Sequence, residues 1–119
     1  MLFRSGGGGS SSIEAHGSAA SPVYIDPTVG LSPSTANDQI WFISPNPGDG
    51  AVSFSAALQI AAGTTIGQRL TLKGNSASDY YIFNDGAGTS QNGPCYLSNN
   101  QAIVYAWNGS VWDEITRRN

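Results

Sequence analysis

Few side chains in this sequence have the types and the spacing that catalysis requires. The single histidine, His16, stands in a stretch rich in Gly, Ser and Ala, where no rigid neighbour would orient it as the base of a Ser/His/Asp triad. The carboxylates considered for a glycosidase pair are Asp79, Asp85, Asp113 and Glu114. Such a pair works only at a defined separation inside a carbohydrate cleft, which a domain this small can hardly enclose. We therefore expect no enzymatic activity and assign no catalytic residue.

Metal and cofactor sites are equally poorly provided for. Asp79 and the segment 85–88 (DGAG) hold oxygen ligands suited to Ca²⁺, but they lack the spaced D-x-D-x-D-G pattern of a calcium loop. One cysteine, Cys95, and one histidine cannot form a Cys/His zinc cluster. We expect no metal and no cofactor, and we expect Cys95 to be a small buried hydrophobe.

Aromatic side chains are the remaining candidates for a binding role. The set considered for a sugar-stacking platform is Trp41, Trp107, Trp112, Tyr80, Tyr81, Tyr96 and Tyr105. In a chain with few aliphatic residues, the core or a subunit interface is the favoured use of such rings. The residues expected in the core or at the interface are Trp41, Phe54, Leu70, Leu72, Tyr105, Trp107 and Trp112.

The elements that would position these residues are strands. Short apolar runs alternate with Gly, Pro, Asn and Asp clusters, and the cluster at residues 45–50 (PNPGDG) excludes a helix or a central strand. Apolar residues recur at about every second position over residues 52–60, and no window shows a helical stripe. About eight short strands predict an all-β domain over residues 22–119, an antiparallel sandwich or barrel of jelly-roll type.

The clearest local signal is a hairpin near the end of the chain. Residues 102–107 and 111–115 flank Asn108-Gly109, a pair that favours a type I′ turn because both residues tolerate positive φ. Trp107 and Trp112 flank this turn and are expected to pack on each other across the strands.

Residues 1–21 form an extended arm by composition, since Ser5 to Ser21 is almost entirely Gly, Ser and Ala. One interpretation is a flexible leader, and GGGGS resembles engineered linkers. The other is an arm that orders only against a partner. In that case its anchors would be the apolar side chains Leu2, Phe3 and Ile13, while Arg4 pairs with an acidic surface.

The composition also limits the possible partners. The chain has five basic and eight acidic residues and a net charge of −3. This composition provides no basic surface for nucleic acid and no polybasic patch for a membrane. Leu, Ile, Val and Phe number only 24 of 119 residues, so one copy has a small supply of core side chains. Association of subunits would add apolar burial, and we expect a homotrimer.

Residues 63–119 carry a set of short motifs in strands and turns. The strand 66–74 (IGQRLTLKG), the strand 102–107 (AIVYAW), the turn segment 108–114 (NGSVWDE) and the terminal Arg-Asn resemble a module of phage fibre and decoration proteins. The resemblance implies a small β-domain that assembles as a trimer on the virion.

Three functions remain open. A capsid decoration (cement) protein, bound to the major capsid protein and stabilising the head, is favoured because the chain holds only an arm and one domain after its initial Met1. A fibre usually carries a long shaft upstream, so a receptor- or glycan-binding tip of a tail fibre, contacting a host-surface glycan, is the alternative. A small glycan-active enzyme is the least favoured of the three.

Overall fold

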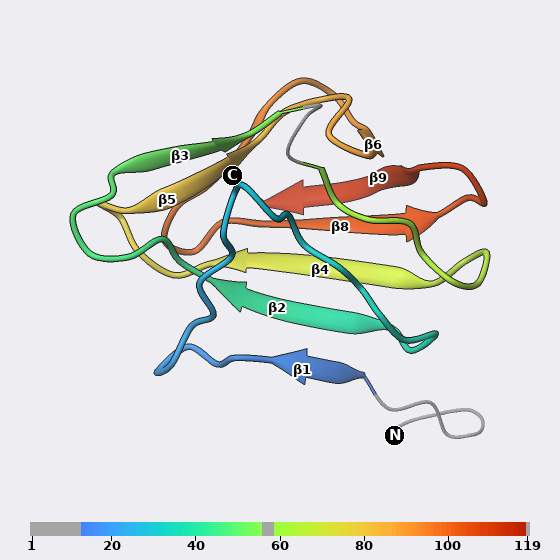
Figure 1. Ribbon diagram of the computed structural model, residues 1–119, viewed down its shortest axis with the longest axis horizontal. Helices are drawn as coiled ribbons and strands as arrows, with labels where there is room; N and C mark the ends of the chain where they lie inside the picture. Colours follow the sequence, from blue (N-terminus) through green and yellow to red (C-terminus); the bar gives the residue numbers. More distant parts are fainter. Residues whose placement is uncertain (1–12, 56–58, 119) are drawn as a thin grey trace.

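Strands make up all the regular secondary structure in the described part of the chain. The computed structural model describes residues 13–55 and 59–118, and these contain nine strands and no helix (Figure 1). The strands are β1 (Glu14–His16), β2 (Gln39–Ile43), β3 (Ala51–Phe54), β4 (Arg69–Gly74), β5 (Tyr80–Phe83), β6 (Thr89–Ser90), β7 (Cys95–Leu97), β8 (Ala102–Trp107) and β9 (Trp112–Arg118). The prediction of an all-β domain is confirmed.

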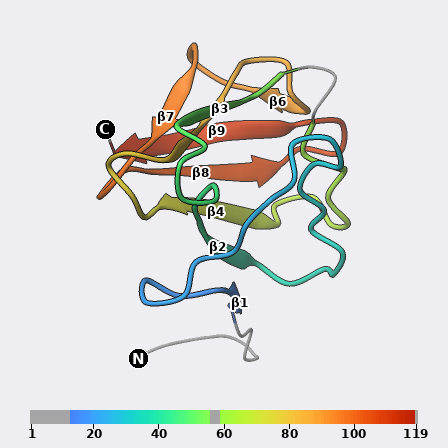
Figure 2. The same ribbon diagram turned by 60° about the vertical axis from the view of Figure 1, so that its left-hand side comes forward.

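The strands form two sheets that pack as a sandwich. A six-stranded sheet has the order β1-β2-β4-β8-β9-β6, and a three-stranded sheet has the order β3-β5-β7. The small sheet lies at the β9 end of the large one, away from β1 (Figures 1 and 2). Phe54 and Phe83 from the small sheet and Leu72 and Tyr105 from the large sheet belong to one buried cluster.

Both sheets are mixed, so the prediction of an antiparallel, jelly-roll-like sandwich is wrong in strand direction. The pairs β1–β2, β2–β4, β3–β5 and β6–β9 are parallel, while β4–β8, β5–β7 and β8–β9 are antiparallel. Parallel neighbours need a long connection to bring the chain back to the starting edge. Alternating apolar residues report which face is buried but not the direction of the neighbouring strand.

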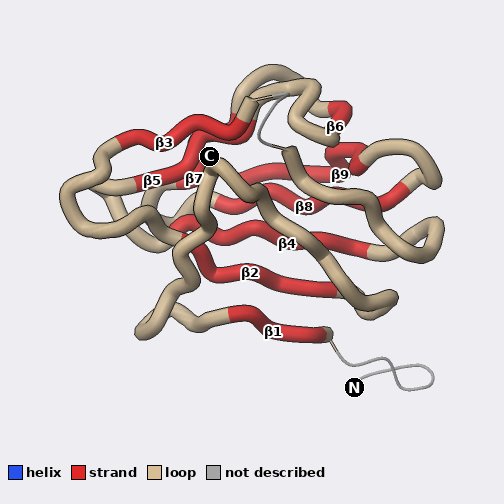
Figure 3. Tube along the Cα trace, viewed as in Figure 1, coloured by secondary structure: helices blue, strands red, loops and turns tan. Residues whose placement is uncertain are grey.

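A long irregular segment, residues 17–38, covers the part of the large sheet that the small sheet leaves open. Figures 1 and 3 show it crossing β4 and β2 on the side of the small sheet. Ile25 and Leu31 of this segment are buried in the core. The Tyr81 hydroxyl accepts a hydrogen bond from the Ile25 amide (2.8 Å) and donates one to the Ile25 carbonyl (2.9 Å), which ties the segment to the small sheet.

The sheet begins inside the segment that composition assigned to the arm. Strand β1 pairs with β2 from Glu14↔Gln39 to His16↔Trp41, and the His16 ring stacks on the Trp41 indole at 4.0 Å. Main-chain pairing, this aromatic contact and the hydrogen bonds that Thr35 and Asn37 donate to Glu14 stabilise the strand. The β-domain was expected to begin at residue 22, and strand β1 lies before that residue. Residues 1–12, with the anchors Leu2, Phe3 and Arg4, are outside the described residues.

The terminal hairpin is confirmed, but its turn differs from the prediction. The Trp107 and Trp112 rings pack at a centroid distance of 5.3 Å. The loop spans residues 108–111, and only Gly109 of the Asn-Gly pair has positive φ (101°). Asn108 acts through its side chain instead, because its Oδ1 accepts hydrogen bonds from the amides of Ser110 (2.8 Å) and Val111 (2.9 Å).

Candidate functional site

Most of the residues expected in the core or at a subunit interface are covered by their own chain. Trp41 is half-buried, and the buried members of the set are Phe54, Leu70, Leu72, Tyr105, Trp107 and Trp112. One chain therefore covers six of these seven side chains, and Trp41 keeps part of its surface in solvent.

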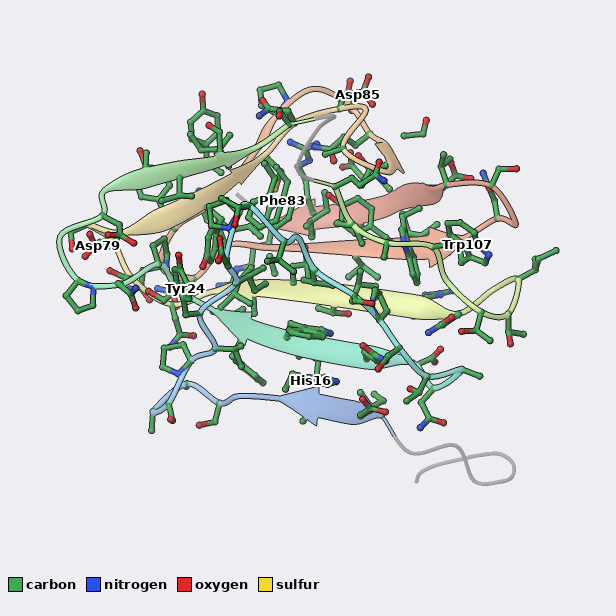
Figure 4. All side chains as sticks on the ribbon, viewed as in Figure 1. His16, Tyr24, Asp79, Phe83, Asp85 and Trp107 are labelled. Atoms are coloured by element: carbon green, nitrogen blue, oxygen red, sulfur yellow. The ribbon has the colours of Figure 1, made fainter. Side chains whose placement is uncertain are left out.

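The four carboxylates considered for catalysis do not gather at one place, although Asp85 and Glu114 accept hydrogen bonds from the adjacent amides of Gln91 and Asn92. Asp79 and Asp85 lie beyond opposite ends of β5 (Figure 4). Glu114 forms an ion pair with Arg117 at 2.7 Å, and hydrogen bonds from that guanidinium hold the pKa of the Glu114 carboxyl below its usual value. Asp113 accepts a hydrogen bond from the Asn108 amide group.

Metal ligands and membrane spans give no further candidates in the described ranges. Within residues 13–55 and 59–118, no three His, Cys, Asp or Glu side chains gather closely enough to hold a metal ion. In the same ranges no helix is long and apolar enough to cross a membrane. Cys95 is buried as expected, and its burial raises the pKa of the thiol to about 11.

Exposure divides the aromatic residues into two groups. Tyr81, Tyr105 and Trp112 are fully buried and Trp107 is 9% exposed, so these rings belong to the core. Tyr96, in contrast, is 47% exposed. Tyr80 is half-buried beside it, and Trp41 is half-buried on β2, where the His16 ring stacks on it. Tyr80 and Tyr96 are therefore the neighbouring pair of the considered sugar platform that solvent reaches.

The two tyrosines stand on the outer face of the small sheet because strand residues alternate between faces. Tyr81 and Phe83 point into the core, so Tyr80 and Ile82 point outward, and Ile82 is paired with Tyr96 of β7. The Tyr80 and Tyr96 ring centroids are 6.3 Å apart with a 43° tilt. We call this surface the tyrosine face; its members are Ala51, Ser53, Tyr80, Ile82 and Tyr96.

The chemistry of the tyrosine face is that of a neutral, amphipathic surface. None of its five side chains is charged, while Ser53 and the two tyrosines supply hydroxyl groups beside aromatic carbon. Tyrosine combines a large apolar ring with a hydroxyl that donates and accepts hydrogen bonds. Such a surface suits a ligand that has both C–H faces and hydroxyl groups, as sugar rings do.

The core beneath the tyrosine face keeps it rigid. Phe54 stacks on Phe83 at 4.5 Å and meets Tyr81 edge-on at 5.4 Å. Burial raises the pKa of the Tyr81 phenol to about 12, so this group stays neutral and hydrogen-bonded to the Ile25 backbone. A binding surface carried by packed strands loses little conformational entropy when it binds.

Arg117 and Gln91 position the start of β7, and the sequence did not point to either of them. The Arg117 guanidinium donates to the carbonyls of Pro94 (2.9 Å) and Asn92 (3.1 Å). The Gln91 side chain donates to the Phe83 carbonyl at 2.8 Å and accepts a hydrogen bond from the Tyr105 hydroxyl. Both side chains hold the loop before Tyr96, and neither belongs to a motif that a single sequence reveals.

The fold and this surface define a small all-β sandwich module with an exposed aromatic face. Residues 25–113 match the family of phage depolymerase C-terminal beta sandwich domains, a match that spans well over half of the chain. The chain belongs to this family and is a phage β-structural protein. No curated protein matches it.

Proposed function

We propose that the chain is a receptor- or glycan-binding module of a phage tail protein, with the tyrosine face as its contact surface. One observation carries the proposal: two tyrosines that the core does not use stand side by side on the outer face of a rigid sheet. The family supports it, because its members are named as C-terminal domains of phage depolymerases, which must engage a polymer.

The tail assignment has better support than capsid decoration. The decoration hypothesis places an N-terminal arm on the major capsid protein, and Ile13, the proposed anchor among the described residues, is 66% exposed next to β1. The family name points to a depolymerase, so we favour a virion protein of the tail.

The proposed role is binding without catalysis. A sugar ring would lie over Tyr96 and Tyr80, with hydroxyl contacts to Ser53, and the host-surface glycan would be recognised by shape and hydrogen bonds. One shallow aromatic site of this kind binds weakly. We therefore also propose a homotrimer, because three linked copies of the site raise the overall affinity without any new contact.

The experiment compares two tyrosine variants on immobilised host-surface glycan. Tyr80→Ala/Tyr96→Ala is expected to weaken binding about tenfold, equal to about 1.4 kcal/mol, because the rings supply most of the contact area. Tyr24→Ala is the matched control, since Tyr24 is 43% exposed but lies outside the tyrosine face. Equal affinity of the double variant and the control would contradict the proposal.

A further inference from the structure

The basic side chains of this acidic protein gather on one surface. The described residues contain four of them, Arg69, Lys73, Arg117 and Arg118. Arg117 turns inward to Glu114. Arg69 and Lys73 alternate with the buried Leu70 and Leu72 on β4, so they project from the opposite, outer face of the six-stranded sheet.

Arg118 joins this outer face through the pairing of the strands. Lys73 pairs with Ala102, and Ala102 pairs with Arg118, so the two cations flank a small residue. Two strand spacings place their backbones about 10 Å apart. Phe42 lies beside Lys73 on β2 and adds an aromatic ring to the same row. We call Phe42, Lys73, Ala102 and Arg118 the basic row.

The cations of the basic row have no acidic partner among the described residues. Two ion pairs are present there, and they join His16 to Glu14 and Arg117 to Glu114. Asp113 shares the outer face, but its strand position places it across Ala106 from Arg69, at the other end of β4. Among the described residues, Lys73 and Arg118 therefore have no carboxylate at ion-pair distance, and the Lys73 ammonium donates a hydrogen bond to the Gly74 carbonyl (3.2 Å).

A groove runs across the same outer face next to the basic row. It has a volume of about 380 Å³, and its lining joins Ile40, Thr71 and Val104 to Arg69 and to the acidic Asp38, whose carboxylate accepts a hydrogen bond from the Arg69 amide (2.9 Å). Thr71 is two residues from Lys73 on β4, so the groove and the basic row are continuous. The combination offers charge, a hydroxyl group and apolar carbon to one extended ligand.

We propose that this outer face binds an acidic polysaccharide, with sugar carboxylates held between Lys73 and Arg118. Charge complementarity at Lys73 and Arg118 carries the proposal, since the face holds three of the four described basic residues and its carboxylates, Asp38 and Asp113, lie at the Arg69 end. A second protein copy fits less well, because lysine, the residue type at position 73, is depleted at protein interfaces. Three cations are too few to follow a nucleic-acid backbone.

The acidic site goes beyond the proposed function, because it uses another face and another class of ligand. The tyrosine face holds no charge and lies on the other sheet. Substitutions on one face should therefore leave binding at the other unchanged, and the two proposals can fail separately.

The test measures binding of the full chain to polygalacturonate, with neutral dextran as the reference polymer. The unmodified protein is expected to bind polygalacturonate, and more weakly as salt is raised, because salt screens charges that are exposed to solvent. Lys73→Gln/Arg118→Gln is expected to weaken this binding at least tenfold, while Tyr80→Ala/Tyr96→Ala leaves it unchanged. Arg118→Gln alone, at an exposed position, is expected to show a smaller loss and guards against misfolding of the double variant.

A charge-matched control separates the site from the net charge of the protein. Ala51→Glu/Ser53→Glu changes the net charge equally but places it on the tyrosine face, and it should reduce polygalacturonate binding far less. Three outcomes would overturn the proposal. They are no binding by the unmodified protein at low salt, equal losses in both double variants, or dissociation of an oligomer by Lys73→Gln/Arg118→Gln.

Discussion

Trp112 shows how much of this small domain depends on a few large side chains. It is fully buried, packs against Trp107, and its indole nitrogen donates a 2.9 Å hydrogen bond to the Ala61 carbonyl. The ring thereby connects the terminal hairpin to the segment before β4. Close packing of the backbone restricts Gly74 in a similar way. A Cβ at this position would come within 2.3 Å of the Leu97 carbonyl oxygen, where β4 meets β7.

Replacement of Trp112 should therefore be severe. Trp112→Ala is expected to lower the free energy of unfolding by about 3–5 kcal/mol, a large part of the stability of a domain this size. Thermal and urea unfolding followed by circular dichroism would measure the loss. Ile115→Ala, on the same strand but 51% exposed, is the control and should change stability little. A melting temperature of Trp112→Ala equal to that of the control would contradict the prediction.

At the scale of elements, the ion pair at the end of β9 organises the loop before β7. Glu114 accepts two hydrogen bonds from Arg117 at 2.7 and 2.8 Å and one from the Asn92 amide at 2.8 Å. These contacts favour the charged carboxylate and lower its pKa from the ordinary value of 4.5. The group therefore contributes stability that is present above pH 4.5 and disappears as the pH falls through the lowered pKa.

This linkage predicts how acid affects the protein. The stability advantage of the unmodified protein over Glu114→Gln should be constant near neutral pH and should shrink as the pH falls below about 4.5, because protons then bind the unfolded chain first. Urea midpoints measured between pH 3 and pH 7 would follow this difference. A difference independent of pH would mean that the Glu114 charge does not stabilise the loop. Asp113→Asn, on the same strand without an ion pair to a described residue, is the matched control.

At the scale of the whole molecule, the sandwich has two outer faces with different chemistry. The small sheet presents uncharged tyrosines, and the large sheet presents basic side chains. The core between them is closed within one chain. Assembly would therefore add copies of these faces rather than complete a core, and its effect would be on avidity.

The proposed homotrimer has a direct test. Light scattering at micromolar concentration is expected to report three times the chain mass of 12.4 kDa. If trimers form, glycan binding should also weaken when dilution separates them, because each copy then binds with its own low affinity. A stable mass of 12.4 kDa at micromolar concentration would contradict the prediction.

The sequence by itself determined the strand content and much of the core. Period-two alternation placed Leu70 and Leu72 on one face of a strand, and the Asn108-Gly109 signal located the hairpin that joins Trp107 to Trp112. The same alternation puts Arg69 and Lys73 opposite these leucines. These features are local, since each depends on residues that are neighbours in the chain.

Tertiary structure alone decided the rest. Strand direction, the pairing of β1 with β2 and the meeting of Lys73 with Arg118 each depend on segments far apart in sequence. The split of the tyrosines into buried Tyr81 and Tyr105 and exposed Tyr96 depends on which sheet face receives the other sheet. Side-chain alternation is a property of one strand, whereas direction and burial are properties of its neighbours, and a single sequence does not specify which neighbours a strand will have.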